Sequence, residues 1–261
     1  MVTFLHTHRH FIASQVRREL TGRFAGTSLG VLWAILLPLL QAVLYTLVFS
    51  VIMRARPGGE YQQIPFAVWL LAGLMPWSLF AESLSTSAMS VTGNAYMVKK
   101  TMFDKRVLPF SCVLSAAVTH GVSLVVLLVI MLVFGVTPHW GIMLTPLFAA
   151  LVAVFALGWA YILAALNVFF RDLGHILGVV LQLAFFATPI VYPEEFLPEG
   201  LRFLALANPM HHIVTFYRQA IFLGIAPDPA WLLAVAVSVA LFCWLGDALF
   251  RSLAPEFADL L

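Results

Sequence analysis

Aromatic rings and neutral hydrogen-bonding groups recur together in three apolar stretches. The chain of 261 residues has 22 Phe, 7 Trp and 6 Tyr. Ring faces beside amide and hydroxyl groups match the apolar face and hydroxyl rim of a sugar, whereas ion sites need carbonyls or charge. For any one ring, a place in an interfacial belt or against lipid is the alternative interpretation. The candidate rings are Trp33, Tyr45, Phe49, Trp77, Phe80, Phe185, Phe186 and Tyr192, with Gln41, Ser50, Ser78 and Gln182 beside them.

Motifs for nucleotide or metal chemistry are missing. The sequence has no G-x-x-x-x-G-K-[ST] loop and no H-E-x-x-H motif. Cys112 and Cys243 lie in apolar stretches without a partner at metal-ligand spacing, which is typical of small buried hydrophobes. The alternating histidines of segment 6–10 could bind a metal, but a solvated tail is the better interpretation. We predict no catalytic residue, no cofactor bound by this chain and no metal site.

Charged residues are too scarce for a water-soluble domain. Lys and Arg number 14 and Asp and Glu 12, so charged residues make up 10% of the chain and apolar residues 62%; soluble domains have about 25% charged residues. The remaining polar residues could not cover a water-exposed surface without large apolar patches. The solvent must therefore be lipid. The net charge of +2 is small and dispersed, which argues against a nucleic-acid partner.

The charges and the Pro/Gly clusters divide the chain into six predicted transmembrane helices. Residues 107–170 contain no Asp, Glu, Lys or Arg, which suits two spans of about 20 residues separated by the turn at 135–141. Between the fifth and sixth spans, residues 193–229 hold several prolines and only short apolar runs, which predicts re-entrant helices. The predicted spans are residues 31–53, 64–92, 107–134, 142–168, 173–192 and 230–250.

The span centres lack the charges that ion-coupled transporters use. Glu82 and Asp247 fall near span ends, and His120, deep in a span, is more simply a packing histidine. Gly174 and Gly178 form a weak G-x-x-x-G signal for close helix packing. Proton or sodium coupling is therefore disfavoured, and uphill transport must be driven by another chain.

The basic residues predict that both termini are cytoplasmic. Arg54, Arg56, Arg202 and Arg218 are the four of the 14 on the opposite side, and cytoplasmic loops are enriched in Lys and Arg. The other ten are Arg9, Arg17, Arg18, Arg23, Lys99, Lys100, Lys105, Arg106, Arg171 and Arg251.

The first 30 residues form a segment of their own. An apolar stripe of Ile12, Val16, Leu20 and Phe24 recurs every four residues with the arginines off it, which predicts an amphipathic helix in the cytoplasmic interface. An ordinary cytosolic cap on the first span is the alternative.

Several stretches in order resemble one transporter family. They are Arg17-Arg18-Glu19-Leu20-Thr21-Gly22-Arg23-Phe24, Leu29-Gly30-Val31-Leu32-Trp33-Ala34-Ile35-Leu36-Leu37-Pro38, Gly93-Asn94-Ala95, Leu166-Asn167-Val168-Phe169-Phe170-Arg171-Asp172, Ala187-Thr188-Pro189-Ile190-Val191-Tyr192-Pro193 and Asn208-Pro209-Met210. Residues 17–218 thereby resemble the membrane subunit of ABC-2 type polysaccharide exporters, closest to O-antigen exporter permeases. Capsule and teichoic-acid exporters share much of the pattern.

The resemblance implies a transport subunit without enzymatic activity of its own. It implies a homodimer in a bacterial inner membrane, with an ABC-2 domain over residues 31–261 and a channel at the dimer interface. Two cytosolic ATPase subunits would bind ATP and Mg, and the substrate would be an undecaprenyl-pyrophosphate-linked polysaccharide. A drug or small-lipid permease and a glycan-processing enzyme using Glu82 or the glutamates of 194–199 are the alternatives.

The resemblance also assigns roles to three groups of residues. Loop 93–106 would couple to the ATPase, although its charge could instead reflect topology alone. The arginines before the first span would contact the lipid pyrophosphate or headgroups. Region 193–229 would gate the periplasmic mouth. The residues concerned are Asn94, Lys99, Lys100, Asp104, Lys105 and Arg106 for coupling, Arg17, Arg18 and Arg23 for the lipid, and Pro193, Asn208, Pro209, His211 and Arg218 for the gate.

Overall fold

The chain is all-helical, as predicted. The computed structural model describes residues 2–23, 26–54 and 56–261, and no strand occurs within them. Two π-helical segments, Thr46–Ile52 and Gln219–Leu223, extend α2 and α9. The α-helices are α1 (Val2–Arg23), α2 (Trp33–Tyr45), α3 (Phe66–Ala88), α4 (Ala95–Lys100), α5 (Val107–Val133), α6 (Thr145–Phe169), α7 (Leu173–Ala187), α8 (Glu199–Ala207), α9 (Pro209–Arg218), α10 (Pro229–Leu253) and α11 (Phe257–Leu260).

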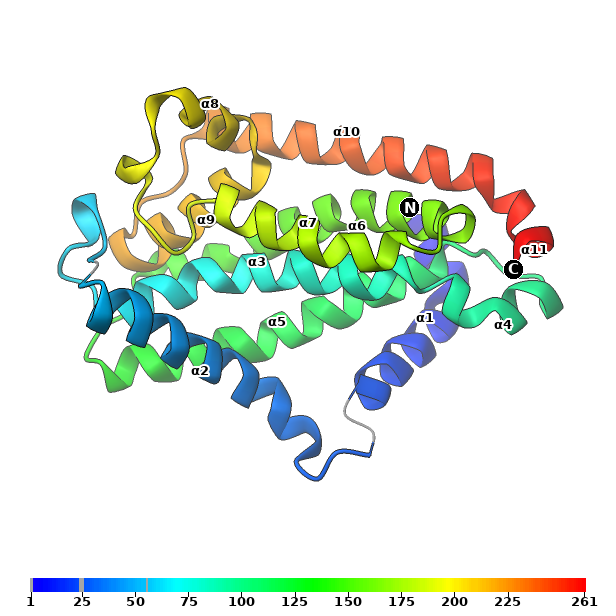
Figure 1. Ribbon diagram of the computed structural model, residues 1–261, viewed down its shortest axis with the longest axis horizontal. Coiled ribbons are helices and arrows are strands. Elements are labelled where there is room, and N and C mark those ends of the chain that lie inside the picture. The colour runs from blue at the N-terminus through cyan, green and yellow to red at the C-terminus, as the bar shows by residue number, and fades with distance from the viewer. Residues whose placement is uncertain (1, 24–25, 55) are drawn as a thin grey trace.

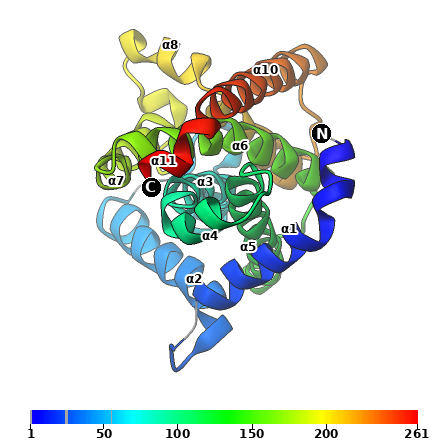
Figure 2. The same ribbon diagram turned by 90° about the vertical axis from the view of Figure 1, so that its right-hand side faces the viewer.

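Helix α3 is the centre of the bundle. It packs against α5, α6, α7 and α9, and α2 joins it on the same side as α7; Figure 2 looks along the bundle and shows these helices around it. Most side chains of α3 are buried. A helix that is apolar on all sides is expected at such a central position.

Four helical segments of the described residues are long and apolar enough to cross a membrane. They are Phe66–Ala88, Val107–Val133, Trp140–Phe169 and Pro229–Leu260. They correspond to the second, third, fourth and sixth predicted spans. The first and fifth predicted spans contain the shorter apolar stretches Ile35–Phe49 and Leu173–Ala187, so the count of six stays a prediction.

Two predicted boundaries differ from the structure. The fifth predicted span, 173–192, ends as a helix at Ala187, because Pro189 follows and Thr188 takes the extended conformation that precedes proline. Loop 93–106 is not irregular throughout, since α4 begins at Ala95 directly after a short 3-10 turn.

The ends of the bundle differ in what they carry. In Figure 1, α4, α11 and the C-terminus lie at one end, and α8, α9 and the connection between α2 and α3 lie at the other. We call them the basic end and the gate end, after the residues predicted for each. Helix α1 lies obliquely against α5, with Ile12 buried and Val16 and Leu20 half-buried. The predicted amphipathic helix is therefore present, while Phe24 lies outside the described residues.

Close helix packing comes from glycines other than the predicted pair. A Cβ on Gly246 of α10 would lie well inside contact distance of the Gly158 carbonyl oxygen of α6, and one on Gly158 would lie 3.0 Å from the Cys243 Cα. Gly178 has nothing within 4 Å. Two glycines on facing helices let the backbones touch, so the close approach joins α6 to α10 and does not involve Gly178.

We expect Gly246→Ala to destabilise the protein by about 1–3 kcal/mol, because the new methyl group meets backbone that only a helix shift can move. The thermal midpoint of the purified protein in detergent measures this. Gly178→Ala is the matched control and should leave that midpoint unchanged or slightly higher. Equal midpoints for the two variants would contradict the assigned contact.

Candidate functional site

A hollow between α2, α3 and α7 collects many of the predicted rings and polar groups. It has a volume of about 230 Å³. Aromatic faces and neutral hydrogen-bonding groups share its wall, and no charged side chain lines it among the described residues. We call it the aromatic hollow. Its lining residues are Gln41, Tyr45, Leu74, Trp77, Ser78, Leu181, Gln182, Phe185 and Phe186.

Phe185 is the centre of the ring contacts in this hollow. Its ring centroid lies 5.9 Å from that of Tyr45, 5.7 Å from Trp77 and 5.2 Å from Phe186. These distances fall in the favourable range for aromatic pairs. Residues more than 100 positions apart in sequence therefore form one surface.

The file of rings continues from the hollow toward the gate end. Tyr45 contacts Phe49 at 6.3 Å, Phe49 contacts Phe66 at 6.3 Å, and Phe66 contacts Trp69 at 5.7 Å. Phe66 and Trp69 belong to α3 and were not among the predicted rings.

One side of the aromatic hollow is bordered by exposed apolar helix faces. Phe186 is 47% exposed, and along α2 and α7 large apolar side chains point away from the rest of the chain. Continuous apolar faces of this kind mark lipid or protein contact. The exposed side chains are Leu37, Leu40, Val43, Leu44, Leu47, Ile176, Val179, Val180 and Leu183.

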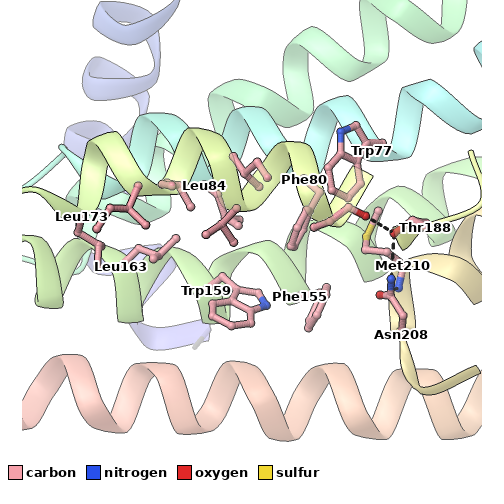
Figure 3. A pocket seen from close by; sticks show the side chains of 15 residues that line it. Trp77, Phe80, Leu84, Phe155, Trp159, Leu163, Leu173, Thr188, Asn208 and Met210 are labelled. Carbon is pink, nitrogen blue, oxygen red and sulfur yellow. Dashed lines mark hydrogen bonds between the residues drawn. The ribbon is translucent and has the colours of Figure 1, made fainter. Parts of the chain in front are cut away.

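A second, apolar cavity of about 270 Å³ lies between α3, α6 and α7. Figure 3 shows Phe80, Phe155 and Trp159 along it, with Thr188 and Asn208 at one end. Asn208 Nδ2 donates to Thr188 Oγ1 at 2.9 Å, and Asn208 Oδ1 accepts from Met210 N at 3.0 Å. Asn208 therefore caps α9 and ties it to the end of α7.

The predicted rings thus divide into groups. Tyr45, Trp77, Phe185 and Phe186 line the hollow, and Phe49 continues its file. Phe80 lines the apolar cavity instead. Tyr192 donates its hydroxyl to the Phe186 carbonyl at 2.5 Å. Trp33, at the start of α2, is not among the described residues that line either space, and the Ser50 side chain lies outside the part that the structure describes.

The predicted coupling residues also divide. Lys99 and Lys100 are exposed at the end of α4, beside Tyr96 at 77% exposure, and Met102 is fully exposed. Asn94 accepts a hydrogen bond from Arg18 of α1 at 2.5 Å. Helix α4 is therefore an open surface, held against α1 at its first residue.

The rest of that loop is bound to α10 and the chain end. Arg106 Nη1 donates to Asp247 Oδ1 at 3.2 Å and its Nε to Asp104 Oδ1 at 2.9 Å, while Arg251 pairs with Asp247. Lys105 Nζ donates to the Ala254 carbonyl at 2.7 Å. We call this group the basic-end clamp.

The clamp shifts the pKa values of its members. Burial alone would raise the pKa of Asp104, but hydrogen bonds and charge from Arg106 outweigh it and leave the pKa below its ordinary value. Hydrogen bonding to Asp104 raises the pKa of Arg106 despite burial. The pair is therefore fully charged at neutral pH.

The predicted lipid-contact arginines do not act together in the structure. Arg17 lines a groove of about 800 Å³ between α1 and α5, whose other walls are mainly apolar, and Arg9 lies on the same groove. Arg18 is the one bound to Asn94. The Arg23 side chain lies outside the described part of the chain.

The predicted gate residues gather at the gate end. Pro193 and His211 are buried, and Pro209 begins α9. His211 Nε2 lies 3.6 Å from Glu194 Oε2, too far for a hydrogen bond. Arg218 is buried over the face of Trp69, 3.5 Å from the ring centroid.

His120 belongs to a buried polar group that crosses the bundle. Its Nε2 lies 2.9 Å from the Tyr217 hydroxyl and its Nδ1 3.3 Å from the Met75 carbonyl oxygen, and Tyr217 donates to the Thr145 carbonyl at 3.2 Å. This agrees with a packing histidine. The partner Tyr217 was not predicted, and a lone ionisable residue in a span was the signal that could have prompted the search.

Catalytic chemistry finds no support at the one serine motif of the sequence. Gly26-Thr27-Ser28-Leu29-Gly30 matches G-x-S-x-G, but it joins α1 to α2 in an exposed turn. That motif requires a strand before it and a helix after it. The described residues also hold no group of three or more His, Cys, Asp or Glu placed for a metal.

Comparison with known proteins identifies the family. The profile of the family described as ABC-2 type transporter matches residues 12–222. The chain belongs to the ABC-2 type transporter family. Such a subunit serves transport across a membrane, which agrees with the apolar helices of the bundle.

Relatives extend the similarity over nearly the whole chain. The O-antigen export system permease protein RfbA of Myxococcus xanthus is 36% identical over 99% of this chain and 98% of its own. The protein of the same name from Klebsiella pneumoniae is 31% identical over 94% and 92%. The polysialic acid transport protein KpsM of Escherichia coli is 25% identical over 90% of each chain.

Proposed function

We propose that this ABC-2 permease exports a lipid-linked polysaccharide of O-antigen type across a bacterial inner membrane, driven by ATP. The aromatic hollow is the observation that carries this proposal, because rings with amide and hydroxyl groups and no charge suit a sugar chain. The names of the relatives in Myxococcus and Klebsiella support the same substrate class. Many weak contacts allow a polymer to be moved in steps.

Six spans with both termini in the cytoplasm are part of the proposal. Helix α7 has 15 residues, or about 22 Å at 1.5 Å per residue, which is shorter than a bilayer core of about 30 Å. Thr188, Ile190 and Val191 continue the path in a non-helical form and are buried. Irregular backbone is tolerated at membrane depth where protein covers it.

A homodimer closes the aromatic hollow in this proposal. The exposed apolar faces of α2 and α7 flank the open side of the hollow, so a second copy placed there would turn two hollows into one channel. The hollow of one chain is thus half of the conducting path.

The energy comes from two copies of a cytosolic ATPase that carry ATP and Mg. Helix α4 offers them an exposed surface of Lys99, Lys100, Tyr96 and Met102 at the end of the bundle that holds the chain's C-terminus. Arg18 links this surface to α1. The groove beside Arg17 would receive the undecaprenyl chain, with the arginine near its pyrophosphate.

Capsular polysaccharide is the second candidate substrate, favoured by the relationship to KpsM. Teichoic acid and a smaller lipid or drug are further alternatives for the same fold. A glycan-processing enzyme is disfavoured, because no carboxylate lines the aromatic hollow.

Deleting the gene tests the proposed function. We expect undecaprenyl-linked glycan to accumulate on the cytoplasmic side and to disappear from the cell surface, as measured by glycan extraction and surface labelling. Re-expression of the wild-type chain is the control. Normal surface glycan in a clean deletion would refute the function.

A further inference from the structure

A separate cavity lies at the gate end, where the loop before α3 meets α9 and the segment after α7. Its volume is about 120 Å³, several times the share of about 30 Å³ that one water molecule occupies. Trp69 and Arg218 line it together with Glu194 and Glu195. None of these four residues lines the aromatic hollow.

Two buried N–H donors on the wall of this cavity lack acceptors. Among the described residues, neither Trp69 Nε1 nor Arg218 Nε has a hydrogen-bond partner. The guanidinium is nevertheless fixed, because Nη1 donates to the Pro189 carbonyl at 3.1 Å and Nη2 to the Ile190 carbonyl at 2.6 Å. A buried donor without an acceptor costs about 1–3 kcal/mol, so both groups favour a ligand that supplies acceptor atoms.

Two glycines make room for the charged side chains of the cavity. A Cβ on Gly73 would lie 2.5 Å from Arg218 Nη2, and a Cβ on Gly58 would lie 2.5 Å from Glu195 Oε2. Any larger residue at either position would displace a charged group. The positions of Arg218 and Glu195 therefore depend on the sequence of neighbouring elements.

The charges around the cavity select an uncharged ligand. A phosphate or carboxylate could accept from Trp69 and Arg218, but it would face the carboxylates of Glu194 and Glu195. A sugar hydroxyl accepts one hydrogen bond and donates another. It can therefore satisfy an N–H on one wall and a carboxylate on the other.

The file of rings leads from the aromatic hollow to this cavity. It passes from Tyr45 through Phe49 and Phe66 to Trp69. A chain that leaves the hollow along these rings would arrive at Trp69. The cavity thus lies at the end of a path that already suits sugar rings.

We propose that the cavity formed by Trp69, Arg218, Glu194 and Glu195 is an exit subsite that binds one uncharged sugar residue of the exported glycan. The inference rests on the proposed function and adds a second contact point to it, at the opposite end from the ATPase surface. Its hydrogen bonds hold the glycan at the gate end between transport steps.

Fluorine NMR of the purified full-length protein labelled with 5-fluorotryptophan tests the subsite directly. The chain has 7 Trp, and the Trp69→Phe and Trp159→Phe variants assign two of the signals. The probes are disaccharides of glucose, mannose, rhamnose and N-acetylglucosamine, with inorganic phosphate as the anionic probe. We expect at least one disaccharide to shift the Trp69 signal but not that of Trp159, which lines the apolar cavity.

Glu195→Gln provides the second arm of this experiment. It keeps the shape of the side chain but removes the charged acceptor, so the disaccharide should bind about tenfold more weakly. A shift of the Trp69 signal by phosphate would make the cavity an anion site and overturn the proposal. No shift with any disaccharide up to its solubility would mean that the cavity holds water alone and would also overturn it.

Export in cells separates failure of the subsite from failure of the proposed function. We expect Trp69→Phe and Glu195→Gln to slow the appearance of surface glycan about fivefold or more, and Trp159→Phe to leave it unchanged. If the first two variants export at the wild-type rate while the gene deletion abolishes export, the subsite is refuted and the function stands. If the deletion itself has no effect, the function is refuted.

Discussion

Reversing Lys99 and Lys100 to glutamate is expected to release the ATPase from the purified complex while the permease stays folded. Both side chains are exposed at the end of α4, where the only printed contact is that of Lys100 with the Tyr96 ring at 5.5 Å. A reversed charge on a docking surface turns attraction into repulsion and costs several kcal/mol. We expect at least a tenfold loss of co-purified ATPase, with an unchanged thermal midpoint of the permease alone.

Arg106→Gln is the informative control from the same loop. Arg106 binds Asp104 and Asp247 within the chain, and a hydrogen bond to a charged group contributes about 1.5–3 kcal/mol. This variant should therefore lower the thermal midpoint of the permease itself. If the Lys99 and Lys100 reversal retained the ATPase at the wild-type ratio, α4 would not be the docking surface.

The helices were predictable because charge ends a membrane helix and apolar length defines it. Residues 107–133 form one helix close to the predicted 107–134, which begins directly after Lys105 and Arg106. The end of α7 was not predictable from hydropathy, since the residues up to Tyr192 remain apolar. There Pro189 decides the outcome through backbone sterics.

The aromatic hollow was predictable as a set of residue types and only partly as a set of positions. Tyr45, Trp77, Phe185 and Phe186 meet as expected, but Phe80 turns to another cavity and Trp33 to neither. A span that is apolar on every side has no moment to show which face is inside. The sequence therefore indicates which rings exist but not which of them share a wall.

The charged loop was predicted as one functional unit because its partners are distant in sequence. Asp247 and Ala254 lie 141 and 149 positions from Arg106 and Lys105 respectively. Only the folded chain divides the cluster into an open helix, α4, and the basic-end clamp. Gly158 and Gly246 escaped notice for the same reason, since each is a lone glycine within its own span.

Replacing Phe185 with leucine is expected to slow glycan export about tenfold or more while the protein remains folded. Phe185 contacts the rings of Tyr45, Trp77 and Phe186, and each aromatic pair contributes about 0.5–1.5 kcal/mol beyond the area it buries. Leucine keeps most of the apolar volume, so the loss of stability should be modest. Surface glycan per permease molecule, followed over time after induction, measures the effect.

Phe80→Leu is the matched control, because Phe80 and Phe185 are both 6% exposed but Phe80 lines the apolar cavity. The two variants lose similar packing, so they should have similar thermal midpoints. Only the variant in the aromatic hollow removes a ring from the proposed sugar path. If Phe185→Leu and Tyr45→Leu both exported glycan at the wild-type rate, the hollow would not conduct the polymer, and a smaller lipid or drug would become the better substrate. If Phe80→Leu slowed export as much as Phe185→Leu, the effect would reflect packing of α3 and not contact with the glycan.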